Sequence, residues 1–172
     1  MPGALPLLSV ALRELVACAS DGEVPVALRP QVLQAVDRLA EIIRDEQEAA
    51  GSDGPPGGEP AVVVVDSRTR PRMVRRLGHA VAARLGARAL GVVGLSGQEP
   101  PQHDVGSAFR LAQVARSLTL QGWSAQALDE LRERTVVLVD DWSDSGWTLT
   151  TAAFLLREAG AAAVHPFVLA QR

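Results

Sequence analysis

Two adjacent carboxylates and a short loop with hydroxyl and glycine residues have the spacing to hold a phosphorylated sugar. Asp140 and Asp141 directly follow the apolar run Val136–Val139, and the loop Ser145–Thr148 opens a helix. Gly146 lets the backbone approach a ligand closely, and the free amides at the start of a helix attract an anion. Carboxylates one strand end away can accept hydrogen bonds from ribose hydroxyls or hold magnesium through water. The pattern therefore predicts a phosphosugar site.

The elements that position these residues follow from the hydrophobic spacing. Val136–Val139 is aliphatic without polar alternation, which is typical of a parallel strand buried on both faces. Because two consecutive carboxylates cannot both stay in a core without partners, we expect the strand to end at Asp140 and both carboxylates to emerge at the sheet edge. The following helix should end at Gly160. In the alternative interpretation, the acidic pair only opens a turn, and Ser143 or Asp144 only caps the helix.

This stretch resembles the signature of the type I phosphoribosyltransferases. In that family four apolar residues, an acidic pair, two further residues and a D/T-T/S-G-x-T loop bind phosphoribosyl pyrophosphate. The resemblance implies that Asp140 and Asp141 take the ribose hydroxyls and hold magnesium through water. It also implies that Asp144 serves as a base toward a nucleobase. The 5-phosphate would then be bound by Asp144, Ser145, Gly146, Trp147 and Thr148.

The sequence departs from the family signature at three positions. Trp142 and Ser143 stand where aliphatic residues are usual, and Ser145 stands where threonine is commoner. A narrower likeness runs from about Ala61 to the end of the chain. That stretch is similar to the phosphoribosyltransferase-like domain at the carboxyl end of certain bacterial RecQ-type DNA helicases, and more loosely to ComF proteins. Gly106 replaces the asparagine that is usual in the helicase domains.

A second loop with basic residues follows another apolar strand. Ala61–Val65 is fully apolar and leads into Asp66–Arg70 and then a helix. In the family the equivalent loop binds pyrophosphate, so we assign Arg68 and Arg70 to the pyrophosphate, because a guanidinium forks onto two oxygens at once. Arg70 is also a catalytic candidate, and Arg110 is a further candidate for the pyrophosphate. The alternative is that these arginines belong to a solvated basic face.

Composition excludes several classes of function. The chain has 172 residues, a net charge of −3 and only arginine among its 17 Lys and Arg residues. Without lysine no Walker-type phosphate loop can be written, so this chain cannot unwind DNA alone, and the mild acidity predicts at most weak DNA binding. The single Cys18 excludes an internal disulfide, and no apolar run reaches spanning length. We expect a cytoplasmic protein without a membrane segment.

The chain should divide into three parts. Residues 1–50 predict a helical hairpin, with one helix over Leu5–Ala17 and a second that opens at Pro30 and runs beyond Ile43. Residues 51–60 are rich in glycine and proline and are typical of a flexible linker. Residues 61–172 would form the phosphoribosyltransferase-like domain. Because two helices bury too little surface to fold alone, we expect the hairpin to pack on that domain.

The rest of the domain alternates strands and helices. We expect a strand over Ala89–Leu95, a polar loop over Ser96–Val105 and a helix over Ser107–Leu118. Ser124 should cap a short helix, and the last strand, Ala163–Ala170, should lie at the sheet edge because it contains a proline. His103 and Asp104, in the polar loop, are a weaker candidate for an acid–base pair.

This alternation predicts an α/β fold: an open, mainly parallel sheet with flanking helices, preceded by a helical hairpin. The leading hypothesis is a domain that binds phosphoribosyl pyrophosphate or a related phosphosugar with magnesium as cofactor, acting as a glycosyltransferase if it is an enzyme. The alternative is a non-catalytic regulatory or DNA-associated appendage of a RecQ-type ATP-dependent helicase active in DNA repair. Candidate partners are therefore a helicase, as a separate protein or as the parent chain, and a second copy in a homodimer.

Overall fold

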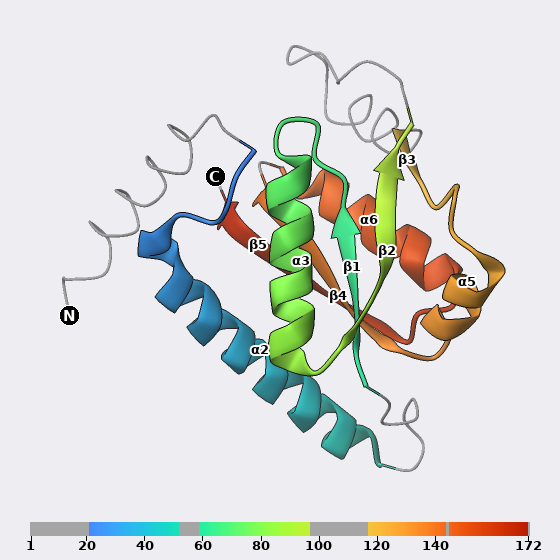
Figure 1. Ribbon diagram of the computed structural model, residues 1–172. Helices are drawn as coiled ribbons and strands as arrows, with labels where there is room; N and C mark the ends of the chain where they lie inside the picture. The colour runs from blue at the N-terminus through green and yellow to red at the C-terminus, as the bar shows by residue number, and fades with distance from the viewer. Residues whose placement is uncertain (1–20, 52–58, 97–116, 144, 172) are drawn as a thin grey trace.

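The computed structural model describes residues 21–51, 59–96, 117–143 and 145–171. Five strands form one sheet in the order β3-β2-β1-β4-β5 (Figure 1). Strands β2, β1, β4 and β5 pair in parallel, and the short β3 pairs antiparallel with β2. The predicted open, mainly parallel α/β sheet is thus confirmed. The strands are β1 (Ala61–Val65), β2 (Arg88–Leu95), β3 (Leu118–Thr119), β4 (Thr135–Ser143) and β5 (Ala163–Gln171).

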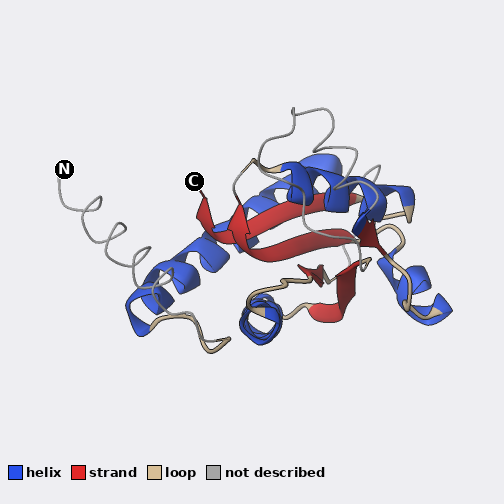
Figure 2. Cartoon of the chain, turned by 90° about the horizontal axis from the view of Figure 1, so that it is seen from above, coloured by secondary structure: helices blue, strands red, loops and turns tan. Residues whose placement is uncertain are grey.

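Helices cover both faces of this sheet, as Figure 2 shows from above. On one face lie α2 (Arg29–Ala50), which follows the short 3-10 helix η1 (Val26–Leu28), and α3 (Pro71–Leu85). On the other face lie α5 (Ala125–Leu131) and α6 (Trp147–Glu158). Strand β1, between the two layers, is buried on both faces, as its purely aliphatic sequence predicts.

The core is divided in two by the sheet. Val62 and Val64 of β1 face α2 and α3, whereas Val63 and Val65 face α6. This alternation is the two-residue period of a strand, with both sets of side chains buried. The two faces of one short apolar strand therefore hold both helix layers against the sheet.

Helix α2 packs on the sheet domain, as expected for the second predicted helix. Val36 and Ile43 are buried in the same cluster as the aliphatic side chains of α3 and β1. Asp37 also binds Arg84 of α3 through two hydrogen bonds, at 2.7 and 2.8 Å. The first predicted helix, over Leu5–Ala17, and linker residues 52–58 lie outside the described residues. No helix among the described residues has the length and apolarity to cross a membrane.

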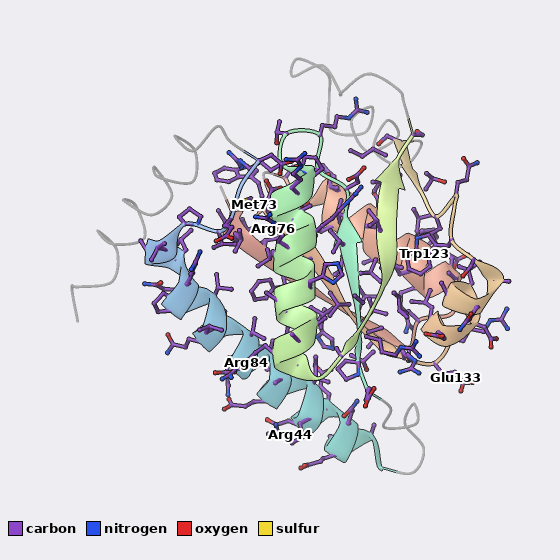
Figure 3. All side chains as sticks on the ribbon, viewed as in Figure 1. Arg44, Met73, Arg76, Arg84, Trp123 and Glu133 are labelled. Atoms are coloured by element: carbon purple, nitrogen blue, oxygen red, sulfur yellow. The ribbon has the colours of Figure 1, made fainter. Side chains whose placement is uncertain are left out.

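The β2 edge of the sheet differs from the sequence prediction. Leu118 was expected at the end of a helix but lies in β3, where it pairs with Leu95 and is buried. Strand pairing and burial override the helical spacing here; the rest of that predicted helix lies outside the described residues. Beyond β3, the indole nitrogen of Trp123 donates to the carbonyl of Val92 at 2.8 Å (Figure 3). This side chain therefore satisfies part of the β2 edge.

The predictions for Ser124 and for the last strand agree with the structure. Ser124 caps α5 by accepting a hydrogen bond from the amide of Ala127 at 3.1 Å. Strand β5 lies at the edge of the sheet, and Pro166 in its middle lacks the amide that a further strand would need. Helix α3 ends at Gly86, whose φ of 63° is the left-handed conformation typical of a helix C-terminus.

Candidate functional site

The connections of the sheet place its ligand crevice between β1 and β4. These strands are neighbours, and Val64, near the carboxyl end of β1, pairs with Val139 of β4. From β1 the chain passes through α3 on one face to reach β2, whereas from β4 it passes through α6 on the opposite face to reach β5. The two connections diverge, so a crevice opens where β1 and β4 end. The two loops selected from the sequence meet at this point.

Strand β4 does not end at Asp140, so that prediction is wrong. It continues to Ser143 because β5 is equally long, and Trp142 and Ser143 pair with Ala170 and Gln171. On its other side, pairing with β1 stops at Val139. The acidic pair therefore lies just past the end of β1 but inside a ladder with β5, where both residues are buried.

Burial and mutual repulsion set the protonation of this acidic pair. Burial, followed by the negative charge of Asp141, raises the pKa of Asp140 to about 8. The Asp140 carboxylate accepts a hydrogen bond from the amide of Asp141 at 2.8 Å, which lowers that pKa only in part. Without a ligand, Asp140 thus holds a proton at neutral pH. A ligand that supplies hydroxyl donors or a cation would favour the charged form.

Arg70 reaches across the crevice to Asp141. Its Nη1 lies 3.2 Å from Oδ2 of Asp141, and both side chains are mostly buried. Its backbone amide donates to the Ser67 hydroxyl at 3.1 Å, which fixes the end of the β1 loop. Arg68 is more exposed, and its guanidinium lies 3.5 Å from the carbonyl oxygen of Ser96 at the end of β2. Both predicted arginines therefore lie in the strand-end loop, with Arg70 against the acidic pair.

The start of α6 forms the other side of the crevice. Gly146 is the N-cap residue with φ of 75°, and no described side chain caps the helix. A Cβ at this position would meet no atom within 4 Å, so the space beside the backbone is open. The alternative interpretation in which Ser143 caps the helix is wrong, because Ser143 is a buried strand residue. The open amides of the first turn are suited to an anion.

A cavity of about 190 Å³ lies between Asp140 and the start of α6. This volume suits part of a phosphosugar, since whole small-molecule pockets usually measure roughly 300–1,000 Å³. Trp142, the aromatic residue at a usually aliphatic position of the signature, lines it. Ser145 is exposed, and Trp147 packs its ring against the core beneath α6. The lining residues are Asp140, Trp142, Ser143, Ser145, Gly146, Thr148 and Leu149.

Several predicted site residues lie outside the described part of the chain. These are the candidate base Asp144, Arg110, and the loop residues His103 and Asp104. The structure therefore brings together the acidic pair, Arg68, Arg70 and the segment Ser145–Thr148. That set contains both carboxylates and both strand-end arginines of the sequence prediction.

The donor set at the acidic pair is compatible with magnesium. No group of three or more His, Cys, Asp or Glu that could hold a metal occurs among the described residues. Magnesium, however, is usually held by one or two carboxylates together with water and substrate phosphates. Asp140 and Asp141 supply those two carboxylates at the mouth of an anion site. The chemistry of these residues therefore fits the ion, provided that Asp140 loses its proton.

The fold defines an α/β protein with a crevice at the switch point between β1 and β4. The family model for the phosphoribosyl transferase domain matches residues 26–172, which is most of the chain. This chain belongs to the phosphoribosyl transferase domain family. The match confirms the resemblance to type I phosphoribosyltransferases at family level, while the narrower likeness to RecQ-type and ComF proteins stays a prediction. A comparison with curated proteins gives no match.

Solved structures share the fold at low sequence identity. A glutamic acid mutant from a study of an invariant aspartic acid in HPRTs is 12% identical with a TM-score of 0.53. The alignment covers 84% of this chain and 67% of that one. The hypoxanthine phosphoribosyl transferase of Trypanosoma cruzi is 14% identical with a TM-score of 0.52, over 84% of this chain and 65% of that one. The chain thus spans about two thirds of the length of these structures.

Proposed function

We propose that this chain binds phosphoribosyl pyrophosphate, or a closely related phosphosugar, at the crevice between β1 and β4. One observation carries the proposal: a buried acidic pair lies beside the start of α6, where no described side chain caps the helix, with Arg70 opposite. Carboxylates recognise vicinal hydroxyls, free helix amides recognise phosphate, and a guanidinium recognises a second phosphate. These three chemistries occur together in a phosphorylated ribose that carries pyrophosphate.

Each part of the ligand has an assigned partner. Asp140 and Asp141 accept hydrogen bonds from the ribose hydroxyls, and the backbone of Ser145–Thr148 holds the 5-phosphate. Arg70 and Arg68 face the pyrophosphate, and Asp144 is the candidate base toward an acceptor. Magnesium, held by the acidic pair through water, would neutralise charge on the pyrophosphate when bound.

Calorimetry with ribose 5-phosphate and with phosphoribosyl pyrophosphate, each with magnesium or with a chelator, tests this proposal. We expect binding that weakens at least about tenfold without magnesium, because the negative charge of Asp141, and of Asp140 when it ionises, then repels the phosphates. No binding by the wild-type protein at millimolar ligand would refute the proposal.

Gly146→Ala is the sharpest variant for the phosphate subsite. It adds a methyl group to the open space at the start of α6 and strains a residue whose φ is 75°. Gly86→Ala is its matched control, since Gly86 has φ of 63° and equally open surroundings but lies at the far end of α3. Both should lose about 1–2 kcal/mol of stability. Only Gly146→Ala should lose affinity for ribose 5-phosphate, and equal affinities in the two variants would refute the phosphate subsite.

A second candidate is a binding module without chemistry, associated with a RecQ-type helicase. It is favoured by the likeness from Ala61 to the end of the chain and by the shorter span relative to the hypoxanthine enzymes. Direct DNA binding should be weak, because Arg75 and Arg76 on α3 already pair with Asp66 and Glu23, at 3.4 and 3.6 Å. Ligand binding without turnover, together with altered unwinding by an added RecQ-type helicase, would favour this candidate over an enzyme.

A further inference from the structure

The N-terminus of α3 is capped by a residue from a distant part of the chain. Its N-cap residue is Arg70, whose side chain has no hydrogen-bond acceptor and makes no cap. The carboxylate of Asp21 replaces it, accepting hydrogen bonds from the amides of Arg72 and Met73 at 2.7 and 2.9 Å. Asp21 precedes Arg72 by 51 positions. The segment before α2 therefore supplies the helix cap that the side chain of Arg70 cannot provide.

This division of roles leaves Arg70 available to the site. A serine or aspartate at position 70 would cap the helix itself but would be too short to reach the acidic pair. With Asp21 holding the next two amides, the Arg70 side chain extends to Asp141 at 3.2 Å. The backbone of Arg70 is fixed between the Ser67 hydroxyl and the first turn of α3, where its carbonyl accepts from Val74 at 3.1 Å. Asp21 stabilises that turn.

The same segment also contacts the wall of the cavity. Leu28, Met73 and Ala170 form a buried cluster, and Val24 and Trp142 pack against it. Met73 connects the helix cap to the cavity wall. Its amide donates to Asp21, and its side chain belongs to the cluster that supports Trp142. Figure 3 shows Met73 at the end of α3 that faces the segment leading into α2. Glu23 holds this segment further by pairing with Arg29 at 2.6 Å.

We infer that Asp21 is a positioning residue of the phosphosugar site. By capping α3 it sets Arg70 against Asp141, and through Met73 it sets the Trp142 wall of the cavity. The inference rests on the proposed function and extends it, since it makes residues 21–28 part of the site.

Asp21→Ala, Asp21→Asn and Asp37→Ala together test the inference. Asp37 is a matched control, because it also joins the amino-terminal segment to α3, through Arg84 at the opposite end of that helix (Figure 3). Asp21→Ala should weaken phosphoribosyl pyrophosphate binding with magnesium by about 3- to 30-fold, the range that corresponds to a lost helix cap. Asp21→Asn should restore affinity, since asparagine also caps helices. Asp37→Ala should bind as the wild type does.

A second measurement needs no ligand, so failure of the inference can be told from failure of the proposed function. In proton–nitrogen NMR spectra of the free protein, Asp21→Ala should shift the Nε–H signal of Arg70 and the indole signal of Trp142. Asp37→Ala should leave both signals in place. Faster exchange of the Arg72 and Met73 amides with unchanged Arg70 and Trp142 signals would make the cap merely structural and overturn the inference. If Asp21→Ala does not fold, Asp21→Glu, with a carboxylate one methylene too far, provides the same comparison.

Discussion

Two influences raise the pKa of Asp140: its burial in the β4–β5 ladder and the negative charge of Asp141 beside it. In the folded protein the pKa of Asp140 is about 8, whereas its ordinary pKa, which applies in the unfolded chain, is 3.8. Between these two values the folded protein keeps a proton that the unfolded chain releases. The folded state thus binds more protons over this interval. The free energy of unfolding of the ligand-free protein should therefore fall as pH rises from about 4 to about 8, and then level off.

Asp140→Asn should remove this loss of stability. At pH 8.5 the variant should be more stable than the wild type by roughly 1–3 kcal/mol, because a neutral amide replaces a buried charge. At pH 4.5 the two proteins should differ little. Urea unfolding at both pH values measures the difference, and the same variant should lose affinity for ribose 5-phosphate.

Asp37→Asn is a control for a carboxylate whose pKa shift, and therefore whose effect on the pH dependence of stability, has the opposite sign. The hydrogen bond from Arg84 lowers the pKa of Asp37, so this carboxylate contributes stability above its ordinary pKa that is lost on acidification. Being fully exposed, it should contribute little, and its variant should never exceed the wild type in stability. A pH profile of Asp140→Asn parallel to that of the wild type would contradict the assigned role of burial.

At the residue level, the sequence was informative where chemistry is local. The acidic pair, Gly146 and Arg70 follow from residue types at strand ends, and all lie at the crevice. Asp21 could not be found this way, because its partners are about 50 positions away and only the packing of α2 on α3 brings it to them. Trp142 was noticed as a departure from the family, but its place in the cavity depends on the length of β4.

Element lengths depend on partners that hydrophobic spacing does not reveal. The end of β4 was predicted from the cost of burying two carboxylates. In the structure that cost is reduced by Arg70 for Asp141 and by protonation for Asp140. Pairing with β5 then carries the strand to Ser143. Strands and helices with a regular spacing of apolar residues, such as Ala61–Val65 and the helix that follows Arg70, have bounds within a few residues of those predicted.

Helix α3 approaches β1 so closely that only glycine fits at position 78. A Cβ built on Gly78 would lie 2.3 Å from Cγ2 of Val64, a buried side chain in the middle of β1. In an isolated helix, glycine to alanine gains about 1 kcal/mol. Here Gly78→Ala should instead destabilise the protein by about 1–3 kcal/mol, because the helix must move off the strand.

Urea unfolding of Gly78→Ala and His79→Ala measures this effect. His79 is the next residue of α3 but is exposed, so its replacement by alanine should be neutral or slightly stabilising. Because α3 begins at Arg70, the displaced helix should also weaken ribose 5-phosphate binding in Gly78→Ala. A stabilised Gly78→Ala variant would contradict the close packing of α3 on β1.

At the scale of the whole molecule, the site exists because two crossovers diverge. Helices α3 and α6 leave β1 and β4 on opposite faces, so the loops they follow face each other across a crevice that neither element forms alone. The alternation of strands and helices was enough to predict an open, mainly parallel sheet with a ligand crevice at its strand ends, but not the strand order or the face on which each helix lies. It did not predict the antiparallel β3, since a two-residue strand leaves no period in the sequence.

The last prediction is that the isolated chain transfers ribosyl groups slowly or not at all. Phosphoribosyl transfer passes through a cationic sugar and a departing pyrophosphate, so catalysis requires charge at both. Arg70 pairs with Asp141 in the ligand-free protein, the loop Ser96–Val105 contains no arginine, and the chain contains no lysine. Asp140, protonated at neutral pH, adds no negative charge toward the sugar until it ionises. The kcat/KM of any residual reaction, which reports the ligand-free protein, should therefore rise with pH up to about 8.

Pyrophosphate release tests this prediction directly. The protein is incubated with phosphoribosyl pyrophosphate, magnesium and a panel of nucleobases, orotate, anthranilate and glutamine, with a hypoxanthine phosphoribosyltransferase assayed in parallel. We expect release at the background rate of hydrolysis, because Arg70 is paired with Asp141 and Asp140 is protonated at neutral pH. Release well above background that disappears in Arg70→Ala and Asp144→Asn would instead establish the chain as an enzyme and identify both residues as part of its catalytic machinery.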